Sequence, residues 1–265
     1  MQWRVGTFNV NGIRARIGLV KQWLEGAGVD VLALQETKVA DEAFPAGEFE
    51  ELGYRAWFWG QKAYNGVAVL TRAEPDECVR GMDDGWEGAR ARVVAVRLGR
   101  VWVVNTYVPQ GRAPDDPAFE YKLEFLARLR QWFDRAFSPG EPLLWVGDIN
   151  VAPGPEDVFD PQRLDGHVGY HPREREAFRA LVEWGLVDLL RLHHPTGRHF
   201  TFWDYRLPQA FKRGLGWRLD HIMATAPMAE CCKDCWVEAR LRGAPKPSDH
   251  APVVADFDLP AEWGL

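Results

Sequence analysis

Long apolar runs are missing from this sequence of 265 residues. No stretch reaches the roughly 18 consecutive apolar residues that a membrane-spanning helix needs, so no membrane partner is expected. The first residues, MQWRVGTFNVNG, also lack the basic segment and following apolar segment that mark a secretory signal. These absences predict a soluble, cytoplasmic protein.

Cysteine is scarce, and its placement gives little support to a zinc site. Of the four cysteines, three crowd into ECCKDC as Cys231, Cys232 and Cys235. Cys232 and Cys235 have the C-x-x-C spacing, but the sequence offers no second C-x-x-C or close histidine pair to complete a zinc set. We expect plain thiols at a strand edge, with a metal-binding or redox role as the alternative.

An excess of positive charge is also absent, because the formal net charge is −6. A protein that binds nucleic acid mainly through phosphates usually carries a basic face, so composition alone counts mildly against that partner. Basic residues nevertheless gather in loops that also hold polar motifs: Arg14, Arg16, Arg112, Lys212, Arg213 and Arg218. A solvated surface is the other interpretation of these clusters.

The chain has neither linkers nor the common nucleotide-binding and hydrolase motifs. Its hydrophobic content of 46% allows a large core, and no Ser/Gly linker, low-complexity tract or block of like charge interrupts it. One domain over residues 1–265 is therefore favoured. The sequence has no G-x-x-x-x-G-K-[ST] loop, G-x-G-x-x-G turn or G-x-S-x-G elbow, which counts against nucleotide kinases, dinucleotide enzymes and α/β hydrolases.

The chain interleaves strand and helix patterns, as an α/β domain does. VDVLALQET and PLLWVGDIN are nearly continuous apolar runs, typical of strands buried on both faces. NGVAVLTR, RARVVAVRLG and RVWVVNTYVP follow one another too closely for helices, which predicts an antiparallel meander and hence a mixed sheet. The predicted helices span residues 14–27, 117–137 and 172–184. We expect Asp116 to cap the second helix, and Gly28 and Gly185 to end the first and third.

Polar side chains stand at strand ends, where a core would carry apolar ones. They are Asn9, Asn11, Glu36, Tyr107, Asp148, Asn150, Asp220, Asp249 and His250. A carboxylate at the end of a buried strand is unfavourable unless it is paired, hydrogen-bonded or bound to metal. Side chains two residues apart share a strand face, so Asn9 with Asn11, and Asp148 with Asn150, are expected to project the same way. The pattern predicts one shared pocket.

Each of these residues alone has an ordinary explanation, such as a turn at Asn11 or a cap at Asp148. Together they supply carboxylates, amides and an imidazole without a usable thiol. That set suits a hard cation such as Mg²⁺ or Mn²⁺ better than structural zinc. An oxygen-lined metal beside a histidine favours attack of water on a phosphate ester.

A series of motifs runs over residues 7–253: TFNVNGIR, LALQETK, NGVAVLTR, NTYVPQG, WVGDINVAP, WGLVDLLR, FTFWDYR, GWRLDHI and KPSDHAPV. In this order they resemble the exonuclease III/AP endonuclease family, within the endonuclease/exonuclease/phosphatase superfamily. The glutamate, the GD-x-N and the SDH belong to the whole superfamily. The PQG, FTFWDYR and WRLD elements are similar to the DNA-repair branch.

The resemblance implies a four-layer α/β sandwich, in which two packed mixed β-sheets are flanked by helices and the site lies at one edge. It also implies a Mg²⁺ site, with Mn²⁺ as the alternative ion. Glu36 would be the principal metal ligand, with Asn11 and Asp249 nearby.

Catalytic roles follow from the same resemblance. Asn9, Asp148 and Asn150 would surround the attacked phosphate, and Asp148 is the favoured residue to position or deprotonate water. His250, oriented by Asp220, would hydrogen-bond the phosphate. Tyr107 would stabilise the developing charge or the leaving oxygen.

Substrate-binding residues are implied in the same way. They would be Gln110, Arg112, Arg92, Phe202, Trp217 and Leu219. Gln110 and Arg112 would contact the DNA backbone, and Arg92 matches a family arginine of less defined role. Phe202, Trp217 and Leu219 would line a pocket for a baseless deoxyribose; without the resemblance they would be assigned to the core.

The implied activity is that of a Mg²⁺-dependent DNA-repair nuclease. It would hydrolyse the phosphodiester 5′ to an abasic site, leave a 3′-hydroxyl, and trim 3′ ends, acting as a monomer on double-stranded DNA. The alternatives are a phosphodiesterase or phosphatase for a small or lipid phosphate, and a DNA-damage binding module without catalysis. Against the last, every acid of the expected set is present.

Some positions depart from the family pattern. His221 replaces an apolar or aromatic residue, and Cys235 is additional. The segment between GDINVAP and HPRERE is short, which leaves the balance of exonuclease and endonuclease activity open.

Overall fold

Two mixed six-stranded sheets form the centre of the computed structural model, which describes residues 1–264. The strands of one sheet are β1 (Gln2–Asn9), β2 (Val31–Gln35), β3 (Arg55–Trp59), β4 (Val67–Thr71), β11 (Cys232–Val237) and β12 (Val253–Asp258). Those of the other are β5 (Glu77–Arg80), β6 (Val93–Leu98), β7 (Val101–Tyr107), β8 (Leu143–Asp148), β9 (Leu186–Asp188) and β10 (Asp220–Thr225). Their orders are β11-β12-β1-β2-β4-β3 and β5-β6-β7-β8-β10-β9.

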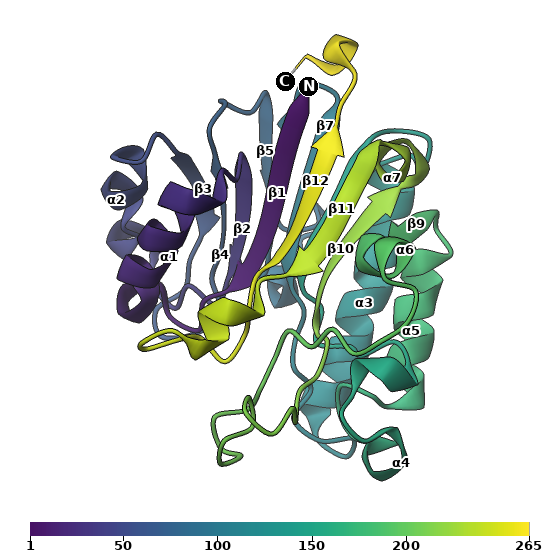
Figure 1. Ribbon diagram of the computed structural model, residues 1–265. Coiled ribbons are helices and arrows are strands. Elements are labelled where there is room, and N and C mark those ends of the chain that lie inside the picture. Colours follow the sequence, from purple (N-terminus) through teal and green to yellow (C-terminus); the bar gives the residue numbers. More distant parts are fainter. Residues whose placement is uncertain (265) are drawn as a thin grey trace.

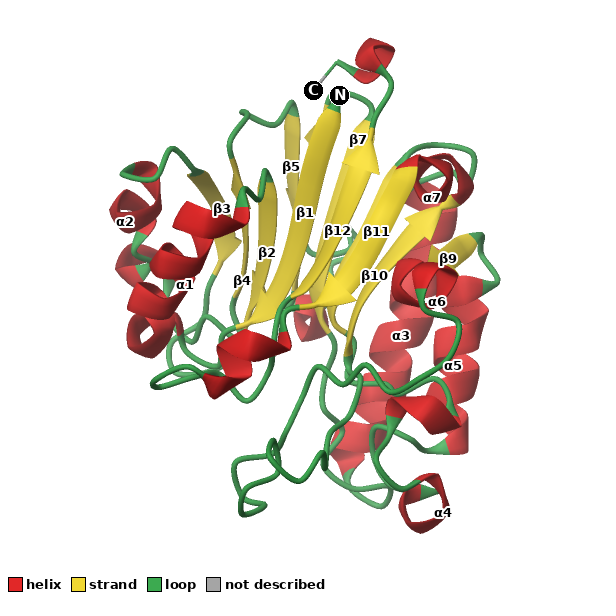
Figure 2. Ribbon diagram, in the orientation of Figure 1, coloured by secondary structure: helices red, strands yellow, loops and turns green. Residues whose placement is uncertain are grey.

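The described residues also form helices, some of which cover the outer faces of the two sheets. They are α1 (Ile13–Ala27), α2 (Ala46–Glu50), α3 (Pro117–Ala136), α4 (Pro161–Leu164), α5 (Pro172–Val182), α6 (Leu189–His193) and α7 (Ala226–Cys231). Short 3-10 turns occur at Asp41–Ala43, Glu87–Ala89, Pro155–Asp157, Ala239–Gly243 and Ala261–Trp263. In Figure 1, α1 and α2 lie on one side of the sandwich and α3 and α5 on the other, and Figure 2 shows the strands between them. The predicted four-layer α/β sandwich is confirmed.

The core explains the continuous apolar strands. Val31 and Ala33 of β2 belong to the apolar cluster between the sheets, whereas Leu32 and Leu34 belong to the cluster under α1. A third large cluster joins the second sheet to α3 and α5. Because successive strand residues face opposite sides, a strand covered on both faces must be apolar at every position.

The predicted helices are confirmed, with small differences at their ends. Asp116 caps α3 by accepting a hydrogen bond from the Ala118 amide. Gly28 follows α1 in a left-handed conformation, with φ 61°. The third predicted helix, α5, stops at Val182, three residues before Gly185.

The predicted meander was wrong in one strand. β4 pairs with β2 and β3 in the first sheet, whereas β6 and β7 pair with each other in the second. The antiparallel meander is β5-β6-β7, because the chain crosses between sheets after Thr71. Short spacing between predicted strands shows that they are neighbours along the chain. It does not show which sheet each strand joins.

Parallel pairing brings the site residues to one edge. β1 runs parallel to β2, and β7 runs parallel to β8, so their carboxyl ends meet at the same end of the sandwich. Asp148 is in register with Tyr107 on one side and Asp220 on the other. Asp220 therefore opens an antiparallel strand instead of ending one. Both termini lie at the opposite end (Figure 1).

The expectation that Asn9 with Asn11, and Asp148 with Asn150, project the same way by sharing a strand face was wrong in its reason. β1 ends at Asn9 and β8 ends at Asp148. Asn11 and Asn150 follow with left-handed backbones, at φ 45° and φ 55°. They reach the edge through tight turns. Within residues 1–264, none of the helices combines the length and apolar character required to cross a membrane.

Candidate active site

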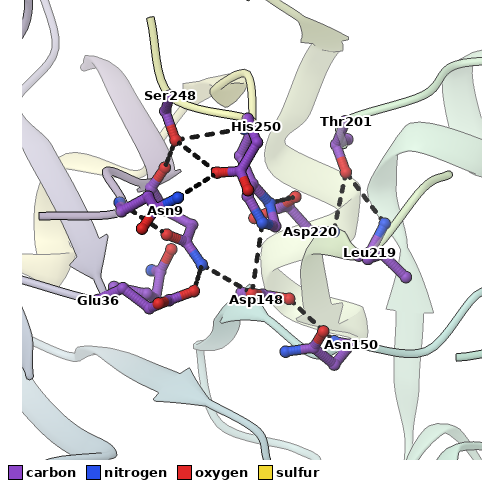
Figure 3. Close-up of polar contacts among 12 residues, drawn as sticks. Asn9, Glu36, Asp148, Asn150, Thr201, Leu219, Asp220, Ser248 and His250 are labelled. Carbon is purple, nitrogen blue, oxygen red and sulfur yellow. Dashed lines mark hydrogen bonds and ion pairs between the residues drawn. The ribbon is translucent and has the colours of Figure 1, made fainter. Parts of the chain in front are cut away.

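A cluster of charged side chains from both sheets forms the centre of the site (Figure 3). Glu36, Asp148 and His250 each offer a ligand atom, and these atoms lie within 4.8 Å of one another. The Asn9 side-chain amide donates to Glu36 Oε1 and to Asp148 Oδ2, at 2.8 Å each. This amide therefore holds together two carboxylates that stand at the ends of strands from different sheets.

His250 is held by a buried carboxylate. Its Nδ1 lies 2.7 Å from Asp220 Oδ2, and its Nε2 lies 3.8 Å from Asp148 Oδ2. The Thr201 hydroxyl accepts hydrogen bonds from the Leu219 and Asp220 amides, which places the carboxylate. Burial alone would lower the pKa of His250, but Asp220 and Asp148 raise it to about 10. The imidazole is thus oriented and positively charged at neutral pH.

The site holds an excess of negative charge. Burial raises the pKa of Asp148 to about 8, and the carboxylates of Asp220 and Glu36 add to the rise while His250 opposes it. Glu36 differs, because burial would raise the pKa of its carboxyl, but Lys38 Nζ at 2.8 Å, with the Asn9 amide and the His250 charge, lowers it. Neighbouring carboxylates raise one another's pKa because their negative charges repel, and a bound cation relieves this repulsion. The donor set fits a hard divalent metal.

The predicted metal ligands lie around Lys38. Asn11 Nδ2 donates to Asp249 Oδ1 at 2.9 Å, and Asn11 Oδ1 accepts from Lys38 Nζ. Lys38 also contacts Glu36, so Asn11, Asp249 and Glu36 form one connected group. Only Glu36 is shared between this group and the closely spaced ligand atoms of Asp148 and His250.

Tyr107 faces the same carboxylates from the end of β7. Burial raises the pKa of its phenol well above the ordinary value, and Glu36 and Asp148 add to the effect. Arg92 lies over the Tyr107 ring at 4.8 Å and donates to the Tyr107 carbonyl at 3.1 Å. The phenol is therefore a fixed hydrogen-bond donor at neutral pH.

The last catalytic residue expected from the sequence, Asn150, is buried beside this group. Its backbone amide donates to Asp148 Oδ1 at 3.0 Å, and its side-chain amide donates to the Val108 carbonyl at the same distance. The side chain is thus fixed between two loops that follow β7 and β8.

The residues expected to bind substrate lie in two places. Gln110 and Arg112 are exposed on the loop after β7, where the Gln110 side chain accepts from the Arg112 amide at 2.7 Å. Phe202, Trp217 and Leu219 belong to one apolar cluster. The Phe202 ring lies 4.9 Å from the His250 ring, between centroids. The aromatic cluster therefore adjoins the charged one.

Sequence reasoning did not single out several residues that build this geometry. Ser248 donates to the Asn9 carbonyl at 2.7 Å and accepts from the His250 amide at 3.2 Å, which ties β1 to the segment before β12. Thr201 supports Asp220, and Lys38 links Glu36 to Asn11. Ser248 and Lys38 stand inside motifs quoted above, so their sequence position was a usable signal.

The cysteines take no part in this cluster, and all four are free thiols. Cys232 and Cys235 are buried on β11, an edge strand, whereas Cys231 ends α7. Burial raises the pKa of Cys232 to about 12. A protonated, buried thiol is a poor nucleophile, in accord with plain structural thiols.

His221, the departure from the family pattern, is buried behind the site. Its Nε2–H donates to the Val151 carbonyl at 2.9 Å, and its Nδ1 accepts from Arg218 at 3.1 Å. Burial and the Arg218 charge lower the pKa of His221 from 6.5 to about 4. The neutral ring thus joins β10 to the loop after Asn150.

A lowered histidine pKa predicts acid sensitivity. Between pH 6.5 and 4 the unfolded chain binds a proton at His221 that the folded chain does not, so stability falls as pH falls. Wild type should lose about 3 kcal/mol more than His221→Phe between pH 7 and pH 4. Urea unfolding followed by circular dichroism measures this, with exposed His167→Phe as the control. Equal pH dependence in wild type and His221→Phe would contradict the assignment.

Comparison with known proteins places the chain among phosphoester hydrolases. The model of the endonuclease/exonuclease/phosphatase family matches residues 6–250. Exodeoxyribonuclease III of Haemophilus influenzae is 37% identical over 263 residues, which cover 95% of this chain and 98% of that protein.

Solved structures agree with this placement. An AP endonuclease from Archaeoglobus fulgidus has a TM-score of 0.94 at 42% identity, covering 97% of this chain and 100% of that one. A 3′ phosphatase from Neisseria, bound to a product DNA hairpin, has a TM-score of 0.91 at 36% identity, with the same coverage. This chain therefore belongs to the endonuclease/exonuclease/phosphatase family, in its exodeoxyribonuclease III and AP endonuclease branch.

Proposed function

We propose that this chain is a Mg²⁺-dependent DNA-repair nuclease that hydrolyses the phosphodiester 5′ to an abasic site and leaves a 3′-hydroxyl. It would also trim 3′ ends of duplex DNA. The observation that carries this proposal is the contact between the aromatic cluster and the catalytic histidine, through Phe202 and His250. Three expectations from the sequence stay predictions: that residues 1–265 form one catalytic domain, that the protein is a monomer, and that it is cytoplasmic.

Glu36, Asn11 and Asp249 would hold the metal, with Asp148 beside it. Oxygen donors and excess negative charge favour Mg²⁺, with Mn²⁺ as the alternative. When bound, the ion neutralises charge on the phosphoryl oxygens.

Proton handling would belong to the residues around Asp148. Asp148 positions and deprotonates the attacking water in its ionised form, which the neighbouring His250 charge favours and a bound cation would favour further. The charged His250, oriented by Asp220, donates to a phosphate oxygen. Tyr107 keeps its proton and donates to the developing charge on the leaving oxygen.

The remaining residues would position the DNA. The side-chain amide of Asn150 keeps one N–H group for the attacked phosphate, whereas Asn9, which donates to Glu36 and Asp148, holds the carboxylates beside that phosphate. The exposed Gln110 and Arg112 contact the backbone, and Arg92 holds Tyr107 from behind. Arg112 places positive charge where the substrate would bind, although the chain as a whole is acidic.

A panel of substrates tests this proposal. Wild type is incubated with an abasic duplex, an intact duplex, a duplex ending in a 3′ phosphate and a phosphoinositide, each with and without EDTA. We expect metal-dependent cleavage of the abasic duplex. A 3′-phosphatase activity is the second candidate, because the Neisseria relative is described as one. Preference for the phosphoinositide would overturn the repair assignment.

Trp217 provides a sharper test of abasic recognition. A baseless sugar has no base edge to read, so selection must come from an apolar pocket that excludes a sugar with its base. Trp217→Ala should lower the ratio of cleavage at an abasic site to cleavage at the same intact site on the order of 10-fold. Folding is checked by circular dichroism.

The matched control is Trp102→Ala, which removes another partly buried tryptophan at the far end of β7. It should leave the ratio unchanged. A constant ratio in folded Trp217→Ala would make the aromatic cluster ordinary core.

A further inference from the structure

A fully buried ion pair joins α3 to α5 behind the site. Lys122 Nζ contacts Glu174 Oε1, and both side chains have 0% exposure. Burying two charges carries a large desolvation penalty, so their mutual attraction is weak evidence for a purely stabilising role. Their other contacts indicate what the pair does.

Lys122 uses each of its donors. An ammonium has three N–H groups. Besides Glu174, they reach the Asn150 carbonyl at 2.7 Å and the Gln110 carbonyl at 3.3 Å. Gln110 lies in the loop proposed to contact DNA. Asn150, with its left-handed backbone, donates its own amide to Asp148 Oδ1 at 3.0 Å. One point charge thus connects two loops of the site.

Glu174 connects a third segment. Its Oε2 accepts from the Gly169 amide at 2.8 Å and from the His171 amide at 3.1 Å. Gly169 has φ 88°, and a Cβ built there would lie 3.3 Å from Trp217 Cζ3. The Gly169 carbonyl accepts from the Ala152 amide at 2.7 Å. The backbone held by Glu174 therefore packs directly behind the aromatic cluster.

We propose that Lys122 and Glu174 are positioning residues, which fix the phosphate-binding loop, the DNA-contacting loop and the wall behind Trp217 relative to one another. Both are anchored in helices, so the loops take their places from rigid elements. An apolar pair of equal volume could fill the space, but it would supply no donors for the two carbonyls and no acceptors for the two amides. This inference rests on the proposed nuclease function.

The variant Lys122→Met/Glu174→Gln tests the pair without leaving an uncompensated buried charge. We expect kcat on an abasic duplex to fall on the order of 10- to 100-fold, with little change in KM, because small misplacements of catalytic groups act on turnover. The conservative variant Lys122→Arg keeps donors for the carbonyls and should retain more turnover. Hydrogen exchange should quicken at residues 149–152 and 167–171.

The control is Arg173→Met/Glu120→Gln. Arg173 and Glu120 form an exposed, two-bonded ion pair between the same helices, at 2.6 and 2.9 Å. Their removal should change neither turnover nor loop exchange. If the first variant folds poorly, Lys122→Gln/Glu174→Gln replaces it, because this pair is also uncharged and a glutamine at 174 offers one acceptor oxygen where the carboxylate offers two.

The outcomes separate two failures. Wild-type turnover and wild-type loop exchange in either folded variant would overturn the positioning role, as would equal loss in Lys122→Arg and Lys122→Met/Glu174→Gln. An inactive wild type would overturn the nuclease function instead. In that case loop exchange still decides whether the pair holds these segments.

Discussion

Replacement of Glu36 by glutamine should lower turnover of an abasic duplex on the order of 1,000-fold, about 4 kcal/mol in the activation barrier. Glu36 is the carboxylate common to both groups of candidate ligand atoms, and Lys38 and Asn9 keep it ionised. The amide of glutamine preserves the size of the side chain but removes its charge. Metal affinity, measured by calorimetric titration with Mg²⁺ or Mn²⁺, should fall in parallel.

The fold should tolerate this change. Glu36 lies beyond the end of β2 and adds to the negative charge around Asp148, so its neutralisation relieves repulsion. Loss of the Lys38 ion pair opposes this relief, so the melting temperature should change little. The exposed Glu42→Gln serves as the control for a nearby carboxylate. Unchanged metal affinity in Glu36→Gln would remove Glu36 from the role of principal ligand.

The Asp220–His250 pair should act as one catalytic unit. Asp220→Asn or His250→Asn should each lower kcat on the order of 100- to 10,000-fold, because either change removes an oriented, charged imidazole. Asp220 Oδ1 has no hydrogen-bond partner among the residues that the structure describes, so the carboxylate serves His250 through Oδ2. Groups that act together give losses that do not add.

The double variant Asp220→Asn/His250→Asn tests whether the two residues act as one unit. Its loss should be close to that of the more damaging single change, when turnover of the three variants is compared on the same abasic duplex. A double loss equal to the sum of the single losses in free energy would mean that Asp220 and His250 act independently. Thermal unfolding of each variant shows whether a loss of turnover results from a folding defect.

Local patterns in the sequence were sufficient to predict individual helices and strands. The apolar run of β2, the capping Asp116 before α3 and the left-handed Gly28 after α1 each depend on a few neighbouring residues. The polar strand ends also stood out by themselves, because a core rarely places Glu36 or Asp148 there. The types and spacing of these residues alone predicted a site for a hard cation and hydrolysis of a phosphate ester. The individual roles came from the family resemblance.

Only the tertiary structure decided which polar residues meet. Asn9 and Asp148 are 139 residues apart and come from different sheets, yet one hydrogen bond joins them. No local pattern encodes such a contact, since it depends on how the two sheets stack. β4 was misplaced for the same reason.

Turns and buried pairs were equally hidden in the sequence. Asn11 and Asn150 reach the site through left-handed backbones that override strand alternation. Nothing in the sequence singled out Lys122 and Glu174, because charged residues are seldom fully buried. Their burial depends on two helices and three loops meeting behind the site, where backbone carbonyls and amides require partners that water does not supply.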